Sequence, residues 1–374
     1  MLRRIWALSI KEFIHLRNDW WLPAFMLIGG AMELLLIAWA TSRPITNLPL
    51  MVLDHDKSPA SRRLLIALEN TGTFNLEEQV YELSTIEDAI NRGKINAALI
   101  IPPGYAAELA SSAGQPTLSV ILNGAESIPA VEALRSIEGV TRDIGNKILI
   151  QRLNLDPEEF AGFEPSLRVR FNEALKEALY TTPAELALML EFTVMLFAAL
   201  AFSRERELGT LEQLLVMPFS SLEIIIGKSI PVIIIGFVDF VLMLSMVNLA
   251  FGVPIRGSLT LLLVVAFGYI LVELSKGMVI SVFSRSQHQA FLLVLLVGMV
   301  DFMFTGYAAP VEGMPKVVQF FANFIPANHW LSILRGILIK GADLAVLWPH
   351  ILALVLLGVG IGSVSWRFIR RALD

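Results

Sequence analysis

The sequence contains no cysteine and few charged residues, and both shortages restrict what the protein is. Without cysteine, disulfide bonds, thiolate metal sites and thiol nucleophiles are excluded. Only 17% of the 374 residues are charged and 55% are hydrophobic, whereas an ordinary soluble domain carries about 25% charge. The mean hydropathy is +0.65. A chain this long and this apolar cannot form a single soluble core, so its apolar excess is expected to face a lipid bilayer.

Several functional motifs are also missing. The sequence has no Gly-x-x-x-x-Gly-Lys-Ser/Thr phosphate loop, so the chain is not expected to bind or hydrolyse ATP. It has no His-Glu-x-x-His motif, no nucleophile elbow, and neither a basic block nor an RNA-binding aromatic motif. We therefore expect no catalytic residue, no metal site and no nucleic-acid partner. Five histidines are scattered along the chain: His15, His55, His288, His329 and His350.

Six apolar segments are long enough to span a membrane, which takes about 20 helical residues. They cover residues 21–40, 183–203, 222–250, 259–283, 290–309 and 347–367. Basic residues concentrate on one side of these segments, at Arg3, Arg4, Lys11, Arg17, Arg204, Arg206, Lys228, Arg285, Arg367, Arg370 and Arg371. The short loops on the other side hold Arg256, Lys316, Arg335 and Lys340. By the positive-inside rule, both termini are expected in the cytoplasm.

The N-terminal segment, residues 1–19, is expected to form an amphipathic helix on the membrane surface before the first span at 20–41. One helical face would carry Leu2, Ile5, Trp6, Phe13 and Leu16, and the opposite face Arg4, Lys11 and His15. Lys11, Glu12 and Arg17 interrupt the apolar core that a signal peptide would need.

A polar stretch, residues 42–181, separates the first span from the second, and the expected orientation places it outside the cytoplasmic membrane. Strands are predicted at 48–53, 97–101, 118–122 and 167–171, and helices at 59–69, 85–93 and 126–153. Ser58 is a predicted N-cap with Pro59 at the first helical position. This alternation predicts a small α/β domain. Asp54-His55-Asp56 is either a cation site, although calcium prefers six or more oxygens, or a turn leading into the Ser58 cap.

The most informative motif is the longest loop expected in the cytoplasm, residues 204–219. Thr210 and Gln213 have the spacing of a capping box, and Gly209 marks a break just before it. Pro218 ends the helix that follows. Its apolar face would consist of Leu211, Leu214 and Leu215. Such a short amphipathic helix between two spans is either a linker lying on the membrane surface or a peg that docks into a cytoplasmic partner.

Two more capping boxes are expected to start spans. Ser220 with Glu223 would begin the third span, and Thr182 with Glu185 the second. In the sixth span, Gly358 and Gly362 have the small-xxx-small spacing that favours close helix packing.

Ionisable residues interrupt the apolar spans and are candidates for a translocation path or a buried charge network: Glu33, Glu191, Asp239, Glu273, Lys276 and Asp301. Each costs about 2.5–3.5 kcal/mol at a helix centre on insertion scales, so they must pair, take up protons or line a wet path. Glu273 and Lys276 are three residues apart and are expected to pair along one helical face, which leaves the other four acids as surplus. The surplus acids either form structural hydrogen bonds or line an acidic cavity for cations or protons.

The loop motif resembles the coupling elbow of the ABC-2 type permeases, the membrane subunits of type-2 ABC exporters. The family pattern Arg-Glu-x-Glu-x-Gly-Thr-x-Glu-x-Leu-Leu falls on Arg204, Glu205, Glu207, Gly209, Thr210, Glu212, Leu214 and Leu215, and Arg206 and Leu211 complete the expected ATPase-coupling elbow. Further similarity covers residues 252–258 and 310–315, and the six-span layout also matches. The chain resembles in particular the bacterial drug-export subgroup, which has a large extracytoplasmic domain after the first span.

This resemblance implies partners. The chain would form a homodimer, or a heterodimer with a similar permease, in the bacterial cytoplasmic (inner) membrane. Each elbow would dock on a separate cytoplasmic ABC ATPase, which would hold ATP and Mg²⁺, whereas this chain would bind no cofactor. A periplasmic membrane-fusion adaptor and membrane lipid are further expected partners. The resemblance also implies an outer re-entrant segment at 310–345, where helices at 317–325 and 328–339 would be broken by Pro326.

The expected fold is therefore a polytopic α-helical membrane protein with six transmembrane helices and an α/β extracytoplasmic domain inserted between the first and second. Spans two to six would occupy residues 182–374. The expected function is that of the permease subunit of an ATP-binding cassette exporter, which couples ATP hydrolysis by the ATPase to efflux of a small amphipathic or cationic compound such as a drug. The alternatives are an ion-coupled secondary transporter using the buried carboxylates, and a non-transporting scaffold whose outer domain recruits an envelope partner.

Overall fold

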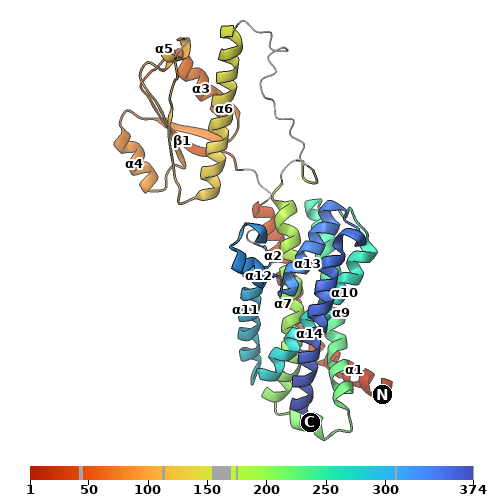
Figure 1. Cartoon of the computed structure of the whole chain (residues 1–374). Helices are drawn as coiled ribbons and strands as arrows, with labels where there is room; N and C mark the ends of the chain where they lie inside the picture. Colours follow the sequence, from red (N-terminus) through yellow and green to blue (C-terminus); the bar gives the residue numbers. More distant parts are fainter. Residues whose placement is uncertain (42–44, 112–113, 154–169, 174–175, 308–309, 374) are drawn as a thin grey trace. The chain divides into compact units, whose positions relative to one another are not determined.

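The computed structural model describes residues 1–41, 45–111, 114–153, 170–173, 176–307 and 310–373 (Figure 1). The chain divides into two compact units. The helical unit comprises Met1–Ser42 and Arg168–Asp374, and the α/β unit comprises Arg43–Leu167.

The helical unit contains six helices that are long and apolar enough to cross a membrane, in agreement with the prediction of a polytopic helical protein. These spans are α2 (Trp21–Thr41), α7 (Ala178–Glu207), α9 (Ser221–Phe251), α10 (Leu259–Phe283), α11 (Gln287–Phe304) and α14 (Leu344–Leu373). The shorter helices are α1 (Leu2–Asn18), α8 (Leu211–Val216), α12 (Lys316–Ala322) and α13 (Pro326–Arg335), with a 3₁₀ turn at Val311–Gly313 and a π-helical turn at Gly336–Lys340.

Helix α7 is the centre of the helical unit. It packs against α2, α9, α10, α11 and α13, and most of its side chains are buried, whereas α2, α11 and α14 bury few. Glycines allow the closest approaches. A Cβ atom at Gly277 of α10 would lie 2.3 Å from the Met195 carbonyl oxygen of α7, and one at Gly236 of α9 would lie 2.6 Å from Cγ2 of Val194. Close packing around α7 therefore depends on these missing side chains.

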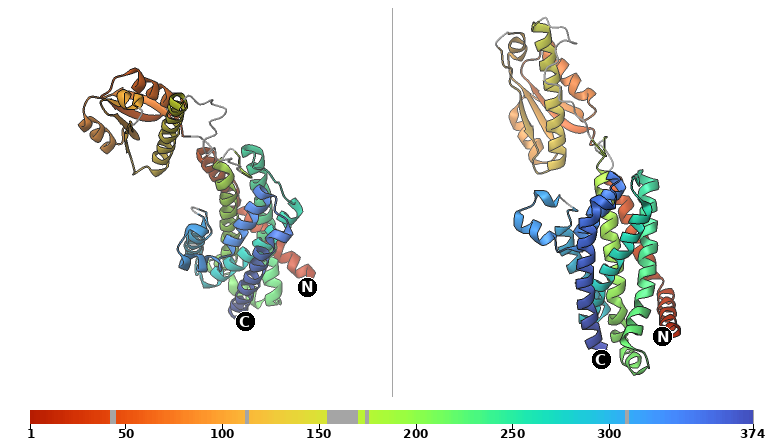
Figure 2. Two further views of the ribbon diagram at one scale, coloured as in Figure 1. Left: turned by 45° about the horizontal axis from the view of Figure 1, so that its top comes forward. Right: turned by 45° about the vertical axis from the view of Figure 1, so that its right-hand side comes forward.

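Different short helices and helix ends lie at the two ends of the helical unit. Figure 2 shows α1, the loop that holds α8 and the C-terminal end of α14 at one end of the unit. At the other end lie α12, α13, the C-terminal end of α2 and the start of α7 (Figure 1). Because α1 and the C-terminal end of α14 lie at the same end of the unit, the chain must cross it an even number of times, in agreement with six candidate spans.

The predicted start of α7 at Thr182 is wrong. The helix begins one turn earlier, at Ala178, and Pro183 lies inside it. The Thr182 hydroxyl donates to the Ala178 carbonyl oxygen at 2.5 Å instead of capping a new helix. Threonine in a helix interior commonly bonds the carbonyl four residues back, so the capping-box spacing alone could not locate the start. By contrast, the Ser220–Glu223 capping box at the start of α9 is confirmed.

The α/β unit contains one four-stranded sheet in the order β2-β1-β3-β4. Its strands are β1 (Leu48–Asp54), β2 (Phe74–Gln79), β3 (Ala97–Ile101) and β4 (Ser119–Leu122), and its helices are α3 (Pro59–Asn70), α4 (Leu83–Asn91), α5 (Tyr105–Ala110) and α6 (Ser127–Leu153). Strand β1 pairs in parallel with β2 and β3, and β4 is antiparallel to β3.

The central strand β1 is buried on both faces. Leu50 and Val52 belong to the apolar cluster that includes residues of α3 and α6. Met51 and Leu53 belong to a second cluster that includes residues of α4. Because successive side chains of a strand point to opposite faces, one apolar run supplies two cores. The resulting three layers explain why β1 is continuously hydrophobic.

Several predictions for the α/β unit need correction. Strand β2 and helix α5 were not predicted, because β2 is an edge strand with few buried side chains and α5 is only six residues long. The strand expected at 167–171 lies largely outside the described residues, and at its described end Phe171 has a φ of 72° and is not in a strand. The Ser58 cap is confirmed, since its side chain accepts from the Ala60 and Ser61 amides.

Candidate functional site

The turn between α7 and α9 holds the predicted elbow. Helix α7 ends at Glu207, and Gly209 adopts a φ of 71° in the turn, a conformation that favours glycine. The predicted Thr210–Gln213 capping box is wrong: the backbone of Thr210 is helical, and its side chain makes no cap bond. The Thr210 hydroxyl instead donates to the carboxylate of Glu205. A buried carboxylate is a stronger acceptor than a neutral group, so it determines where the hydroxyl points.

Glu205 lies at the centre of a buried ionic network that joins three helices. Its Oε1 atom accepts from Lys11 Nζ of α1 at 2.6 Å and from Lys228 Nζ of α9 at 3.1 Å. Lys228 is almost completely buried, and it also donates to Glu12 Oε1 at 2.6 Å and to the Ala201 carbonyl oxygen at 2.8 Å. The two lysines and two glutamates balance in charge, as a buried ionic group must.

Helix α1 is bound along α9 and to the turn after α8. Ser9 donates to the Gly227 carbonyl oxygen at 3.0 Å, and Arg4 Nη1 donates to the Pro218 carbonyl oxygen at 2.7 Å. Ile5 and Leu8 are buried, whereas Leu2 and Trp6 of the predicted apolar face stay exposed. Of the predicted apolar face, Ile5 therefore packs against the protein, while Leu2 and Trp6 do not.

Three other charged residues of the elbow, Arg204, Arg206 and Glu207, also make structural contacts. Arg204 forms an ion pair with Asp19. Arg206 donates to the Val282 carbonyl oxygen at 3.0 Å and to that of Ser284. The Glu207 carboxylate accepts from the backbone amide of Gln287 at 2.7 Å. These contacts tie the end of α7 to α1 and to the turn between α10 and α11.

One face of the elbow remains available. It consists of Leu208, Glu212, Val216 and Met217, all exposed, and we call it the elbow face. Val216 is 87% exposed, although it is apolar. Leu214 turns inward and is buried at 3% exposure. The elbow motif therefore divides into residues that hold the turn and residues that face outward.

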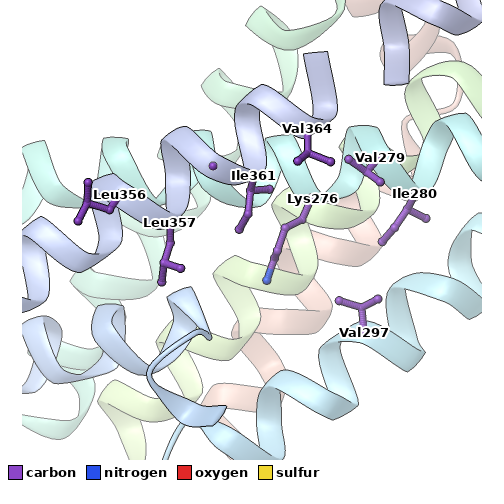
Figure 3. Close-up of a pocket in the computed structure, with 9 residues that line it drawn as sticks. Lys276, Val279, Ile280, Val297, Leu356, Leu357, Ile361 and Val364 are labelled. Carbon is purple, nitrogen blue, oxygen red and sulfur yellow. The ribbon is translucent and has the colours of Figure 1, made fainter. Parts of the chain in front are cut away.

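A second ionic cluster, which we call the Lys276 cluster, lies within the spans. Lys276 Nζ of α10 is 3.1 Å from Glu191 Oε1 of α7, 2.8 Å from Glu273 Oε2 and 2.5 Å from Asp301 Oδ2 of α11. The predicted Glu273–Lys276 pair is confirmed. Glu191 and Asp301 were predicted to be left over once Glu273 pairs with Lys276. Helix packing brings both to the same ammonium group, so they do have a basic partner, although three carboxylates then share one lysine. Figure 3 shows Lys276 beside an apolar groove whose walls include Ile361 of α14.

The other two membrane acids have different surroundings. Asp239 of α9 is buried, and neither of its carboxylate oxygens has a hydrogen-bond partner among the described residues. Glu33 is exposed on α2. For Gly358 of α14, an added Cβ atom would lie 2.8 Å from Cγ2 of Val272 in α10, whereas at Gly362 the nearest atom would be 3.7 Å away. Of the two glycines, Gly358 is therefore the one at which α14 packs more closely against α10.

Polar contacts also cross the opposite end of the helical unit. The Tyr307 hydroxyl donates to Glu185, and burial together with this bond raises the pKa of Tyr307. Arg335 Nη2 donates to the Tyr180 carbonyl oxygen at 3.1 Å, and its guanidinium lies 3.9 Å from the centre of the Tyr180 ring. Arg335 lies in α13, within the helix expected at 328–339, and this bond ties it to α7.

Two of the histidines that look scattered in the sequence meet in the structure. His329 Nδ1 lies 3.1 Å from His350 Nδ1, and His329 Nε2 lies 2.9 Å from the Asn323 carbonyl oxygen. Because a carbonyl oxygen only accepts, Nε2 of a neutral His329 donates to it and His350 supplies the proton between the rings. Across the described residues, no group of three or more potential metal ligands occurs.

The Asp54 segment forms a turn. Asp54 Oδ1 accepts from the Asp56 and Lys57 amides at 2.9 Å each, and Oδ2 accepts from the Ser61 hydroxyl at 2.7 Å. Asp56 accepts from the Ala106 amide at 3.1 Å. These bonds occupy the oxygens that a cation would need, so the structure favours the turn over the cation site.

After the six candidate spans and the turn that holds the predicted elbow, comparison with known proteins decides the family. The model of the ABC-2 family transporter proteins matches residues 20–367. The chain belongs to the ABC-2 transporter family. The match covers every spanning helix of this ABC-2 protein except the last residues of α14, and it includes the elbow.

Two bacterial relatives of this ABC-2 protein are similar along almost their whole length, and a longer relative is similar over about half of its own. The "Probable multidrug ABC transporter permease YbhR" of Escherichia coli K12 is 26% identical over 371 residues, which are 99% of each chain. The "Inner membrane transport permease YhhJ" of the same strain is 26% identical over 376 residues, covering 100% of this chain and 98% of its own. The "ABC transporter G family member 20" of Dictyostelium discoideum is 22% identical over 90% of this chain and 46% of its own.

The Glu205 network includes residues that sequence reasoning missed, whereas the four ionic residues of the Lys276 cluster had all been singled out. Lys11, Glu12 and Lys228 were noted only as loop or surface charges. One local signal was present for Lys228, which lies in the otherwise apolar stretch Ile224-Ile-Ile-Gly-Lys228 at the start of a span. A lysine in such an apolar stretch needs a buried partner, but the neighbouring sequence does not show which acid pairs with it.

Proposed function

We propose that this ABC-2 protein is the permease subunit of an exporter in the bacterial inner membrane, with both termini cytoplasmic. In this role it moves a small amphipathic or cationic compound, such as a drug, while a separate ATPase subunit hydrolyses ATP. ATP and Mg²⁺ belong to that ATPase, and the permease is not itself an enzyme. Family membership and the printed names of the two Escherichia coli permeases support the proposal.

The observation that carries the proposal is the construction of the elbow. A helix of six residues is too short to be stable by itself. Here the Glu205–Lys228 network and the contacts of α1 hold the turn from both sides. A movement of the elbow face would therefore be transmitted to α7 through Glu205 and to α9 through Lys228. Such a rigid connection suits a peg that transmits movement from an ATPase to the spans, and a loose surface linker would not need it.

The exposed surfaces of two spans support the proposal that the permease pairs with a second copy, either identical or similar. Helices α2 and α11 bury few of their side chains, and Glu33 is exposed on α2. A carboxylate that faces lipid is costly, so a partner helix or a wet cavity is the better neighbour for it. We further propose that the α/β unit lies outside the membrane and binds a periplasmic membrane-fusion adaptor, and that lipid covers the remaining apolar surface.

Co-purification tests the ATPase partner. The tagged full chain is purified gently from native membranes, and mass spectrometry quantifies the proteins that accompany it. The wild type is expected to bring an ATP-binding protein in near-equal amount. Val216→Arg changes the elbow face and is expected to lose that protein while keeping its unfolding temperature. Leu249→Arg, which changes an equally exposed apolar residue at the other end of α9, is the matched control and should retain it.

A folded wild-type chain that purifies without any ATP-binding protein would overturn the proposal. Equal loss of the partner in both arginine variants would also remove the elbow face from the interface. In the first case the alternative is an ion-coupled transporter, which the Lys276 cluster favours because it places three carboxylates within the spans. That alternative predicts ion-gradient-driven flux by this chain alone in liposomes.

A further inference from the structure

One side of helix α1 is apolar, and the rest of the helical unit leaves it uncovered. Leu2, Trp6, Ile10 and Ile14 follow one another at intervals of four residues, and all four side chains are exposed. Residues four apart lie along the same side of a helix, so these four form one stripe, which we call the α1 stripe. Another side of α1 packs on α9. Contiguous exposed apolar surface of this kind marks a site of interaction.

Two arginines flank the α1 stripe, and no acid accompanies them. Arg3 precedes Trp6 by three residues and Arg17 follows Ile14 by three, so both lie on the side of the stripe. Among the described residues, neither arginine forms an ion pair. The one acid of α1, Glu12, is bound in the buried network around Glu205. The stripe therefore offers apolar contact together with unbalanced positive charge.

The packing of α1 indicates that the stripe lies at the level of the lipid headgroups. Helix α1 contacts the first turns of α9, where Ser9 donates to the Gly227 carbonyl oxygen at 3.0 Å, and it lies at the same end of the unit as α8 (Figure 2). Helix α9 has 31 residues, whereas about 20 suffice to cross the hydrocarbon. Between α1 and the body of α2 the chain carries two exposed tryptophans, Trp20 and Trp21. Exposed tryptophans at the start of a span are typical of the membrane–water interface.

We propose that the α1 stripe binds anionic phospholipid, with its apolar side chains among the acyl chains and with Arg3 and Arg17 at the headgroups. Any lipid would cover the apolar side chains, but two unpaired arginines without a neighbouring acid favour a surface of net negative charge. The proposal goes beyond the proposed export function. It uses the proposed orientation only to assign the lipid to the cytoplasmic leaflet, and the binding itself does not require the ATPase.

Lipid bound to the α1 stripe would also support the elbow. Helix α1 supplies Lys11 to Glu205 and Glu12 to Lys228, at 2.6 Å each. If α1 left α9, Glu205 would lose one of its two lysines and Lys228 one of its two glutamates. Anionic lipid that holds α1 in place therefore stabilises this buried network. The helical unit is expected to unfold at a higher temperature in anionic than in zwitterionic lipid.

Spin labels on α1 test the contact with lipid. Because the sequence has no cysteine, one introduced cysteine carries the label alone. The full chain with Ile10→Cys or Ile14→Cys is labelled in nanodiscs, and relaxation by oxygen, which dissolves in lipid, is compared with relaxation by a water-soluble nickel complex. Val216→Cys is the matched control, because Val216 is also apolar and exposed but lies on the elbow face. Labels on the α1 stripe are expected to respond mainly to oxygen, and the label at position 216 mainly to nickel.

Unfolding temperatures in nanodiscs of graded composition test the charge. Stepwise replacement of phosphatidylcholine by phosphatidylglycerol is expected to raise the unfolding temperature of the wild type. The double variant Arg3→Gln with Arg17→Gln is expected to lose at least half of this rise, because each arginine near an anionic surface strengthens binding about fivefold. Arg285→Gln with Arg371→Gln removes the same charge from exposed residues outside α1 and should keep the rise.

Three results would overturn the proposal. Labels on the α1 stripe that respond to nickel as strongly as the label at position 216 would place the stripe in water. Shielding of both stripe labels from oxygen and nickel alike would mean that protein, such as a second copy of this chain, covers the stripe. Equal rises in the wild type and in the Arg3 and Arg17 double variant would show that these arginines do not bind headgroups. None of these measurements involves the ATPase, so failure of the lipid site is distinguishable from failure of the export function.

Discussion

Lys228→Met is expected to destabilise the helical unit strongly, because it removes one cation from a buried, balanced network. The Lys228 side chain is 1% exposed and that of Glu205 is 4% exposed. After the substitution Glu205 keeps Lys11, whereas Glu12 loses its ion pair. Removal of one partner of a buried pair costs about 3–5 kcal/mol. At about 2–4 °C per kcal/mol for a large domain, the unfolding temperature should fall by about 6–20 °C.

Fluorescence-detected thermal unfolding of the purified full chain measures this change. Lys147→Met is the control, because Lys147 and Asp143 are also 2.6 Å apart but are both exposed, and such a pair contributes less than about 1 kcal/mol. The double variant Lys228→Met with Glu12→Gln also neutralises the carboxylate that the first change leaves unpaired. It is expected to recover more than half of the loss, since neutral replacement of a buried pair is often tolerated.

A decrease for Lys228→Met no larger than that for Lys147→Met would refute the argument that burial makes this network important. A double variant as unstable as the single one would show that the unpaired carboxylate is not the source of the loss. Another contact that neither variant retains is that of the Lys228 ammonium with the Phe202 ring, whose centre is 5.5 Å away.

Three further predictions concern backbone and packing. Gly277→Ala should lower the free energy of unfolding by about 1–3 kcal/mol, because the added Cβ atom would overlap α7. Gly268→Ala on the same helix has nothing within 4 Å of the added Cβ atom and should raise the free energy of unfolding by about 0.5–1 kcal/mol. Thermal shifts of the same sign for both variants would contradict this reasoning. Gly209→Ala forces a left-handed conformation at about 1–2 kcal/mol, and it should reduce recovery of the ATPase more than Gly209→Asn does. Ser58→Ala removes a cap worth about 1 kcal/mol, and urea unfolding should show a larger loss than for Ser58→Gly.

Local features of the chain were predictable because they depend on neighbours in the sequence. An apolar run of about 20 residues forms a spanning helix whatever surrounds it, since lipid leaves the backbone no other partner. Ser58 and Ser220 cap helices through amides two or three residues away. Gly209 ends a helix because its own backbone tolerates a positive φ. Thr182 failed as a predicted cap because the same hydroxyl had a second local acceptor.

Pairings between distant residues required the tertiary structure. Lys228 meets Glu12 across 216 positions, and Lys276 meets Glu191 across 85. Whether two such side chains meet depends on which helices are neighbours and on how each is rotated about its axis, and composition specifies neither. The sequence by itself determined the candidate spans, the turn at Gly209 after α7 and the need for buried charges to be neutralised. Only the packing of α1, α7, α9, α10 and α11 decided which acid pairs with which lysine, because a buried charge is stabilised by whatever partner close packing brings within hydrogen-bond distance.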